Sequence, residues 1–498
     1  MTFLQQKQKQ QKQKKAEHQE IDKKRWFVRY LILTAVGIVV SIKVYMALFV
    51  VDAAVGLYSV TTSFILFAIL LLSYTKYKDP FYDTGGPVVS NDTPLVSIIV
   101  PVKNEEDYIR NCIQSCINST YSNKEIIVVN DGSTDMTPKI LDDIRKEQVG
   151  GAGGSNLHII HLSKSGGKKK AIEAAAGIAK GEIYSFMDSD CDMDRDAVKN
   201  AIKIFVSDRK IGALTGHGIV RGTDTGNILL KMQAAYVDVS CRALKGMESS
   251  FSSVTCCSGS LSFYRKEAIQ SHLHEWAHDS FLGIQDFKFA TDRRLTAYVL
   301  AGQPALADSS SNLHNEHRQR NNNIPILQTG KDNLETMKSS SDPDIDAKKG
   351  PRYYWKVKYS QSVRVNNGVP DNLPALIRQQ IRWRKSFIRS LFATGETYWR
   401  RPLPAAVLYY LQLALKFFRP FIVLKALIFL PLSGDYITAL LYFLGVFFSG
   451  MVYGIEFRLR NPGNGMWLYR PLYTLITTFV YTWLIFYAAI TIKKTAWR

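Results

Sequence analysis

Two apolar regions, one toward each end of the chain, constrain the fold more than any other feature. Residues 27–72 carry only three charged side chains, Arg29, Lys43 and Asp52. This region is too long for one bilayer crossing and suits a hairpin of two, which we place near residues 27–47 and 54–74. A signal peptide is a poorer interpretation, because no small-residue cleavage site precedes a polar sequence. The sequence therefore predicts an integral membrane protein.

The basic residues indicate which side of the membrane each end occupies. The formal net charge is +20, and nine Lys and Arg residues lie between Lys7 and Arg29, at the start of the first apolar region. Lys76 and Lys78 follow the second predicted crossing, so both flanks of the hairpin are basic. Cytoplasmic flanks are enriched in such residues. We therefore expect a plasma membrane protein with both termini in the cytosol. We expect no nucleic-acid partner, because the sequence has no basic-aromatic repeat or nucleic-acid-binding module.

The C-terminal apolar region divides into three stretches. Residues 403–432 and 436–453 flank a turn without positive charge, which we expect on the outer side. The third stretch, 471–492, has basic residues at both ends. This favours an interfacial or re-entrant helix with the C-terminus inside, a full crossing being the alternative.

The predicted domains follow from these boundaries. We expect a disordered basic N-terminus (1–26), a transmembrane hairpin (27–79), a cytosolic domain (80–400) with a mobile insertion (308–350), and C-terminal membrane and interfacial helices (401–498). Within 80–400, Val96–Val100 and Glu125–Val129 are short apolar runs, each followed by a polar turn and a helical pattern. That alternation is typical of parallel strands joined by helices. The six cysteines all fall in the cytosolic part and are expected to be reduced thiols.

Polar turns follow the first two predicted strands. Pro101, Asn104 and Glu105 lie after the first, and Asp131 begins an Asp-Gly-Ser turn after the second. Ligands of open parallel sheets bind beyond the C-terminal strand ends, so both turns lie where a nucleotide would sit. Asp131 can accept a hydrogen bond from a uracil N–H or a ribose hydroxyl. The alternative is an ordinary turn and helix N-cap.

Two further segments indicate phosphate and metal chemistry. Asp188 and Asp190 end a third apolar run, where two carboxylates can offer oxygen ligands to a Mg²⁺ or Mn²⁺ that bridges a diphosphate. The alternative is a solvated acidic turn; the Gly and distal Glu of an EF-hand are missing. Lys168 follows Gly166-Gly167 at a predicted helix N-terminus, which suits phosphate, although a solvated lysine cluster is the commoner arrangement.

One motif points elsewhere. His274-Glu-Trp-Ala-His278 fits the helical zinc-protease pattern, which places two imidazoles on one face of a helix. No third ligand is evident downstream, because His314 and His317 fall in the predicted insertion. We interpret these histidines as ordinary helix residues near the domain surface.

Taken in order, four segments resemble the processive family 2 glycosyltransferases of GT-A fold, which include hyaluronan, chitin and chitooligosaccharide synthases. These segments are Asp131-Gly132-Ser133, Asp188-Ser189-Asp190, Thr291-Asp292-Arg293 and Gln379-x-x-Arg382-Trp383. The resemblance covers roughly residues 27–498, excluding 308–350. It implies an α/β GT-A domain with a Rossmann-like, mostly parallel sheet, inserted between N-terminal and C-terminal membrane helices.

The resemblance also implies a role for each matching residue. Asp292 would be the general base that takes a proton from the acceptor hydroxyl, although Thr291 stands where the family usually has an acidic residue. The alternatives are a surface ion pair for Asp292-Arg293 and an interfacial anchor for Arg382-Trp383. The implied donor-binding residues are Pro101, Asn104, Glu105, Asp131, Lys168, Asp188, Gln379 and Arg382; the acceptor-binding residues are Gly259, Ser260 and Trp383; and the metal ligand is Asp190.

The implied function is a membrane-embedded inverting glycosyltransferase. It would transfer sugar from a UDP-sugar, with UDP-GlcNAc the favoured donor, to extend a β-linked polysaccharide and translocate it across the membrane. Mg²⁺ or Mn²⁺ would be the cofactor. The alternatives are a non-processive enzyme acting on a lipid acceptor and a catalytically silent export scaffold. Few helices remain to enclose a pore, so a narrow channel, a homo-oligomer and an export partner all stay open.

Overall fold

The apolar N-terminal region forms a hairpin of two long helices. The computed structural model describes residues 3–82, 93–149, 156–302 and 354–494, so the predicted insertion 308–350 lies outside the described residues. The hairpin consists of α1 (Phe3–Phe49) and α2 (Ala53–Thr75). The apolar part of α1, Trp26–Phe49, and the whole of α2 are long and apolar enough to cross a membrane. Both agree closely with the predicted crossings.

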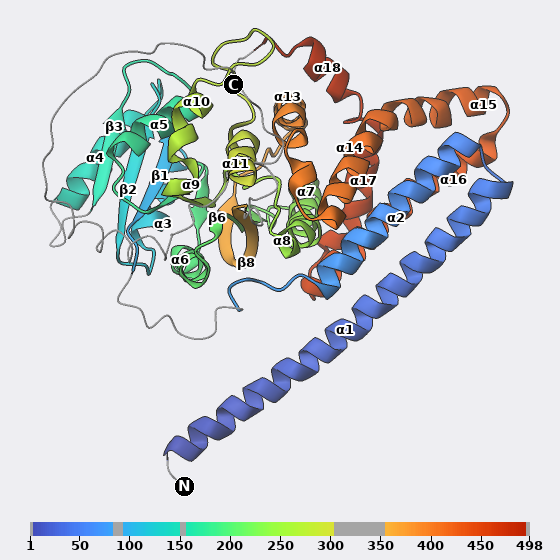
Figure 1. Cartoon of the computed structure of the whole chain (residues 1–498), viewed down its shortest axis with the longest axis horizontal. Helices are drawn as coiled ribbons and strands as arrows, with labels where there is room; N and C mark the ends of the chain where they lie inside the picture. The colour runs from blue at the N-terminus through green and yellow to red at the C-terminus, as the bar shows by residue number, and fades with distance from the viewer. Residues whose placement is uncertain (1–2, 83–92, 150–155, 303–353, 495–498) are drawn as a thin grey trace, which may run out of the picture.

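The prediction of disorder for residues 1–26 is wrong for most of that segment. Helix α1 begins at Phe3 and continues without a break into the apolar part (Figure 1). Residues 4–25 are rich in Gln and Lys, which have high helix propensity, and elongation from an existing helix avoids the cost of nucleation. Composition alone had suggested a chain too polar to fold.

A mixed eight-stranded sheet forms the centre of the polar domain. Its order is β3-β2-β1-β4-β7-β6-β8-β5. Strands β1 to β4 run parallel, β6 and β8 pair in parallel, and β7 and β5 join the sheet antiparallel. The strands are β1 (Val96–Val102), β2 (Lys124–Asn130), β3 (Leu157–His161), β4 (Ile183–Phe186), β5 (Cys191–Met193), β6 (Ile211–Val220), β7 (Ser262–Arg265) and β8 (Lys356–Asn367). The mostly parallel α/β fold is confirmed.

Helices cover both faces of this sheet. Residues of β1 alternate between the two cores, Ile98 and Val100 facing one and Ile99 the other, and all three are fully buried. Burial on both faces explains why the central strands read as continuous apolar runs. One core includes α3 (Ile109–Ile117), α4 (Thr137–Val149) and α6 (Ala197–Ser207); the other includes α5 (Lys168–Ile178), α9 (Lys266–Ile269), α10 (Leu273–Ala277) and α11 (Thr291–Ala301).

The C-terminal region returns to the hairpin. Helix α14 (Leu403–Leu424) continues through η5 (Lys425–Phe429) into α15 (Leu430–Leu432), and α16 (Tyr436–Arg460) is a third helix long and apolar enough to cross a membrane. Asp52, in the α1–α2 turn, pairs with Lys425 at 2.8 Å, and its backbone N–H donates to Thr438 Oγ1. The turn between α1 and α2 and the turn between α15 and α16 therefore lie together at one end of the helix cluster (Figure 1).

The last apolar stretch is broken. Residues 465–479, comprising η6 (Gly465–Tyr469) and α17 (Arg470–Phe479), meet α18 (Leu484–Ile490) at a 46° bend. Such a pair forms either a re-entrant segment, as the basic flanks predicted, or one broken span. A fourth crossing would require the second arrangement.

The polar domain is attached to the helix cluster by buried contacts. The carboxylate of Asp79, just after α2, accepts hydrogen bonds from Ser360 Oγ at 2.7 Å and from the backbone N–H groups of Gln361 and Ser362 at 3.0 Å. Helix α7 (Ile228–Val239) packs on α16 and α17, and α13 (Leu373–Gly395) packs on α18. The sheet domain therefore sits directly against the apolar helices (Figure 1).

Candidate active site

Two carboxylates lie just beyond the end of the central strand β4. The Asp188 N–H donates to the Gly259 carbonyl at 2.9 Å, which fixes the turn. Both Asp188 and Asp190 are half-buried. Burial, together with the charge of Asp188, raises the pKa of Asp190 above its ordinary value. This acidic turn is therefore not the freely solvated surface turn that the sequence left open.

Lys168 is a cation shared by Asp188 and Asp292. It is the first residue of α5, after Gly167, whose φ of +92° lies in a region that favours glycine. Its Nζ forms an ion pair with Asp188 and lies 3.8 Å from Asp292 Oδ1. Burial alone would lower the pKa of Lys168, but the charges of Asp188 and Asp292 raise it, so the ammonium form is retained. The lysine side chain is only 13% exposed, unlike a solvated cluster.

Asp292 completes the group from a third element. It lies in the first turn of α11, where the helix dipole favours a negative charge. Its Oδ2 accepts the Gly259 N–H at 2.9 Å. Burial raises the pKa of Asp292, Lys168 lowers it and Asp188 raises it again, with a net increase. An aspartate with a raised pKa is a stronger proton acceptor, which suits a general base.

Gly259 occupies the centre of this group. Its carbonyl accepts from the Asp188 backbone N–H and its own N–H donates to the Asp292 carboxylate, so Gly259 links the backbone at Asp188 to Asp292. A Cβ at this position would lie 2.6 Å from Lys168 Nζ, 2.9 Å from Asp292 Oδ1 and 3.0 Å from Asp188 Oδ2. Only glycine leaves room for these three side chains. Ser260 follows it and is half-buried.

The two turns predicted to bind a nucleotide are brought together. Pro101 pairs with Val129 in the β1–β2 ladder, and beyond it Asn104 has a φ of +53°. Asn104 Oδ1 accepts from Thr134 N–H at 2.8 Å, and Glu105 N–H donates to Thr137 Oγ1 at 3.0 Å. These bonds join the turn after β1 to the turn after β2.

Asp131 supports the loop that carries Lys168. Its carboxylate accepts from Ser165 Oγ at 2.8 Å and from the N–H groups of Gly166 and Gly167 at 2.7 and 2.9 Å. The residue is 3% exposed. The structure therefore shows a positioning contact for Asp131, and its contact with uridine stays a prediction.

Helix α13 brings the Gln379-x-x-Arg382-Trp383 segment against α11. The Ala290 N–H, just before Asp292, donates to Ser386 Oγ on α13 at 3.0 Å. Gln379 Oε1 is buried without a hydrogen-bond partner among the described residues, and Trp383 is 44% exposed. The exposed indole is available for stacking on a sugar.

A buried ionic cluster around Asp279 was not predicted. Its carboxylate binds Lys169 Nζ at 3.2 Å and Arg389 Nη2 at 2.7 Å, and Arg294 Nε lies 3.8 Å away. Lys169 follows Lys168 on α5, Arg389 lies on α13, and Arg294 lies two residues after Asp292 on α11. The Asp279 carboxylate therefore joins three helices of the site. Burial lowers the pKa of Lys169 to about 8. No local spacing in the sequence signals this cluster, because its members are brought together only by the fold.

A polar cavity of about 230 Å³ lies among the apolar helices. Its lining includes three cationic side chains, Lys43, Lys416 and Arg419, and no Asp or Glu is among the described residues that line it. Lys416 Nζ also lies 4.5 Å from the ring centroid of Phe387 on α13. One residue that lines the cavity therefore contacts the helix that carries Trp383.

The donor set of the site fits a divalent cation. Asp188, Asp190 and Asp292 supply hard oxygen atoms, and Lys168 is the one cation paired with them by a described ion pair. Three carboxylates and one ammonium leave an excess of negative charge in the site. Burial first, and the charge of Asp188 in addition, raises the pKa of both Asp190 and Asp292. Oxygen-only sets of this kind suit Mg²⁺ or Mn²⁺.

Sequence comparison relates the chain to known glycosyltransferases. Residues 97–273 match the model of glycosyl transferase family 2. The chain is 22% identical over 474 residues to a hyaluronan synthase of Streptococcus pyogenes serotype M6, covering 95% of this chain and 97% of the relative. It is 22% identical to hyaluronan synthase 3 of Xenopus laevis, covering 89% and 74%. A mannosyltransferase structure from Pyrobaculum calidifontis, in complex with GDP-Man and Mn²⁺, covers 87% of the chain at 17% identity with a TM-score of 0.49. The resemblance found in the sequence is confirmed.

Proposed function

We propose that this glycosyltransferase, which carries a family 2 domain, is a metal-dependent, inverting polysaccharide synthase. It uses a UDP-sugar as donor, and UDP-GlcNAc is the favoured candidate. The observation that carries the proposal is the meeting of Asp188, Asp292 and Lys168 around the backbone of Gly259, with Asp190 two residues beyond Asp188 in the same turn. The hyaluronan synthases that match along nearly the whole chain support a polysaccharide product.

Asp292 is proposed as the general base. An acceptor hydroxyl beside its carboxylate gives up its proton to Asp292 as the hydroxyl oxygen attacks the anomeric carbon. The bond from that carbon to the diphosphate breaks on the opposite side, which inverts the configuration. Lys168, 3.8 Å from Asp292, favours the ionised carboxylate between turnovers. Gly259 and Ser260 border the acceptor, and Trp383 stacks on its sugar ring.

The remaining residues hold the donor. Asp190, with Asp188 beside it, would bind Mg²⁺ or Mn²⁺, which when bound stabilises the negative charge on the departing nucleoside diphosphate. Arg382 and Gln379 contact the diphosphate from α13, where a planar guanidinium suits two phosphate oxygens. The turns that carry Pro101, Asn104, Glu105 and Asp131 form the nucleoside pocket. These turns lie at the C-terminal ends of β1 and β2.

Export is proposed to begin at α13. Lys416, which lines the cavity, contacts Phe387 of this helix, and the cavity lies among helices that include candidate membrane spans. The proposed path takes a growing polysaccharide from Trp383 toward this cavity. We propose that the catalytic domain and both termini lie in the cytosol, at the plasma membrane; the basic flanks of the hairpin support this orientation.

The test is synthesis by the purified full chain in detergent. Single UDP-sugars, with Mg²⁺ or Mn²⁺, are supplied in turn, UDP release is measured, and the product is sized and digested with linkage-specific glycosidases. We expect UDP release and a long β-linked polymer, and neither from the Asp292→Asn variant. Addition of a single sugar to a lipid would replace the polymer proposal, and no UDP release with any donor would remove the UDP-sugar proposal.

A further inference from the structure

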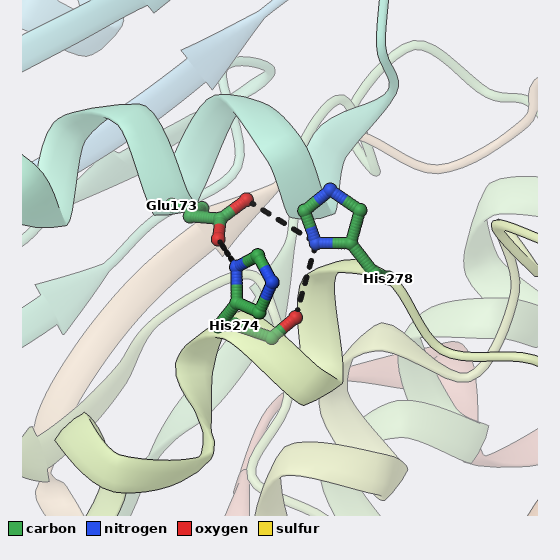
Figure 2. A group of neighbouring side chains, drawn as sticks. All are labelled: Glu173, His274 and His278. Atoms are coloured by element: carbon green, nitrogen blue, oxygen red, sulfur yellow. Dashed lines mark hydrogen bonds and ion pairs between the residues drawn. The ribbon is translucent and has the colours of Figure 1, made fainter.

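Of the two histidines of the His274-Glu-Trp-Ala-His278 segment, His274 lies in the short helix α10 and His278 is the C-cap residue that follows it. They are four residues apart, so their rings lie one above the other, with centroids 4.5 Å apart. Figure 2 shows both rings beside the carboxylate of Glu173, which reaches them from α5. Glu173 Oε1 lies 2.8 Å from His274 Nδ1, and Glu173 Oε2 lies 3.8 Å from His278 Nδ1. The third ligand that the sequence lacked downstream is thus supplied from 101 residues upstream.

We propose that Glu173, His274 and His278 bind a transition-metal dication, with Zn²⁺ the best match, at a site separate from Asp190. One ligand atom from each residue lies within 4.8 Å of the others. In a tetrahedral zinc site with bonds of about 2.1 Å, ligand atoms lie roughly 3.4 Å apart. Modest side-chain rotations therefore close the site, and His274, whose side chain is 83% exposed, is free to make them.

The chemistry of the ligands selects the metal. Two imidazoles and one carboxylate form the set that zinc takes in sites with an open fourth position, here filled by water from the exposed side. Mg²⁺ and Mn²⁺ prefer all-oxygen sets such as that around Asp190. The two sites should therefore differ in the metal that each retains.

The site lacks the machinery of a zinc protease. The glutamate that such an enzyme uses as its base corresponds to Glu275, and this residue is engaged elsewhere. Its Oε1 accepts from Tyr298 Oη at 2.5 Å and from Arg294 at 3.3 Å, both on α11. The bound ion would therefore act on structure rather than on a substrate.

The expected structural effect is a link between α5 and α10. Glu173 lies one turn after Lys169 on α5, and His278 immediately precedes Asp279, so the Lys169–Asp279 ion pair already joins the same two segments. A metal on Glu173, His274 and His278 adds a second link on the surface. Because α5 begins at Lys168, this link would also stabilise the position of Lys168 in the active site.

The test is zinc binding by the full chain, purified in detergent without a histidine tag and stripped of metal with EDTA. Calorimetric titration with ZnCl₂ is performed on the wild type, on Glu173→Gln, His274→Ala and His278→Ala, and on His158→Ala, a control that removes an exposed histidine from β3. The Asp190→Ala variant tests whether the catalytic carboxylates account for the binding.

We expect one zinc site in the wild type, His158→Ala and Asp190→Ala, and at least about a 100-fold weaker affinity in the three ligand variants, since even an outer-shell change costs 10- to 100-fold. Zinc should raise the melting temperature of the wild type and not that of His274→Ala. X-ray absorption should show nitrogen and oxygen ligands at about 2.0–2.1 Å. Equal binding by the wild type and all three ligand variants, or loss of binding in Asp190→Ala alone, would overturn the proposal.

Discussion

Substitution of Gly259 by alanine tests whether the backbone at this position sets the geometry of the active site. The added Cβ would lie 2.6 Å from Lys168 Nζ. Ordinary non-bonded contacts lie near 3.5 Å, so the ammonium group must retreat by close to 1 Å. It would thereby move relative to Asp188 and Asp292, both of which the new methyl group also crowds, at 3.0 and 2.9 Å.

A displacement of about 1 Å in a catalytic group can lower the rate on the order of 100-fold. We therefore expect Gly259→Ala to lower kcat/KM roughly 100-fold, equivalent to about 2.7 kcal/mol of transition-state stabilisation. Stability should change far less, by about 1 kcal/mol, because the crowded atoms are side-chain ends rather than backbone. The melting temperature in detergent should fall by no more than about 4 °C.

The matched control is Gly177→Ala on α5, where an added Cβ meets nothing within 4 Å. UDP release at several donor concentrations is measured for both variants and the wild type. Gly177→Ala should keep full activity. If Gly259→Ala works within threefold of the wild type, or if the two variants lose activity equally, the crowding argument is wrong.

Four further changes probe neighbouring parts of the site. Asp292→Asn should abolish sugar transfer while UDP binding, followed by calorimetry, persists; normal turnover would remove the base assignment. Asp190→Ala should lower the Mn²⁺- or Mg²⁺-dependent rate more than about 100-fold, since it removes the proposed metal ligand, and an unchanged rate would refute that role. Asp279→Asn leaves buried cations unpaired and should destabilise the protein by about 3–5 kcal/mol, measured by chemical unfolding. Burial lowers the pKa of Lys169 to about 8 from an ordinary 10.5. As the pH rises, the folded state therefore loses this proton before the unfolded state does, and the free energy of unfolding should rise with pH between about 8 and 10. A Lys169→Met variant should lack that rise.

The main elements of the fold could be predicted because each has a local signal. The run Val96–Val102 is apolar except at Ser97, as expected for a strand buried on both faces. Ala53–Thr75 is both apolar and long enough to cross a bilayer. Residues 1–26 were misjudged because polar composition suggests disorder, while helix propensity and a neighbouring helix favour α1.

The order of motifs along the chain also indicated which carboxylates would meet. Asp188 and Asp190 end a strand, and Asp292 belongs to a segment that resembles a known family, so their residue types and positions were determined by the sequence. The distances between them were not. Gly259 could be placed near the acceptor from resemblance, but its hydrogen bonds to both carboxylate segments depend on how β4, β7 and α11 pack.

Sequence by itself determined the apolar spans, the strands and the residues able to do acid-base and metal chemistry, because these follow from patterns within a few residues of one another. Tertiary structure alone decided that Asp279 joins α5, α11 and α13, and that Glu173 faces His274 and His278. Both groups combine residues more than 100 positions apart. Their meeting depends on the path of the whole chain, which no local pattern records.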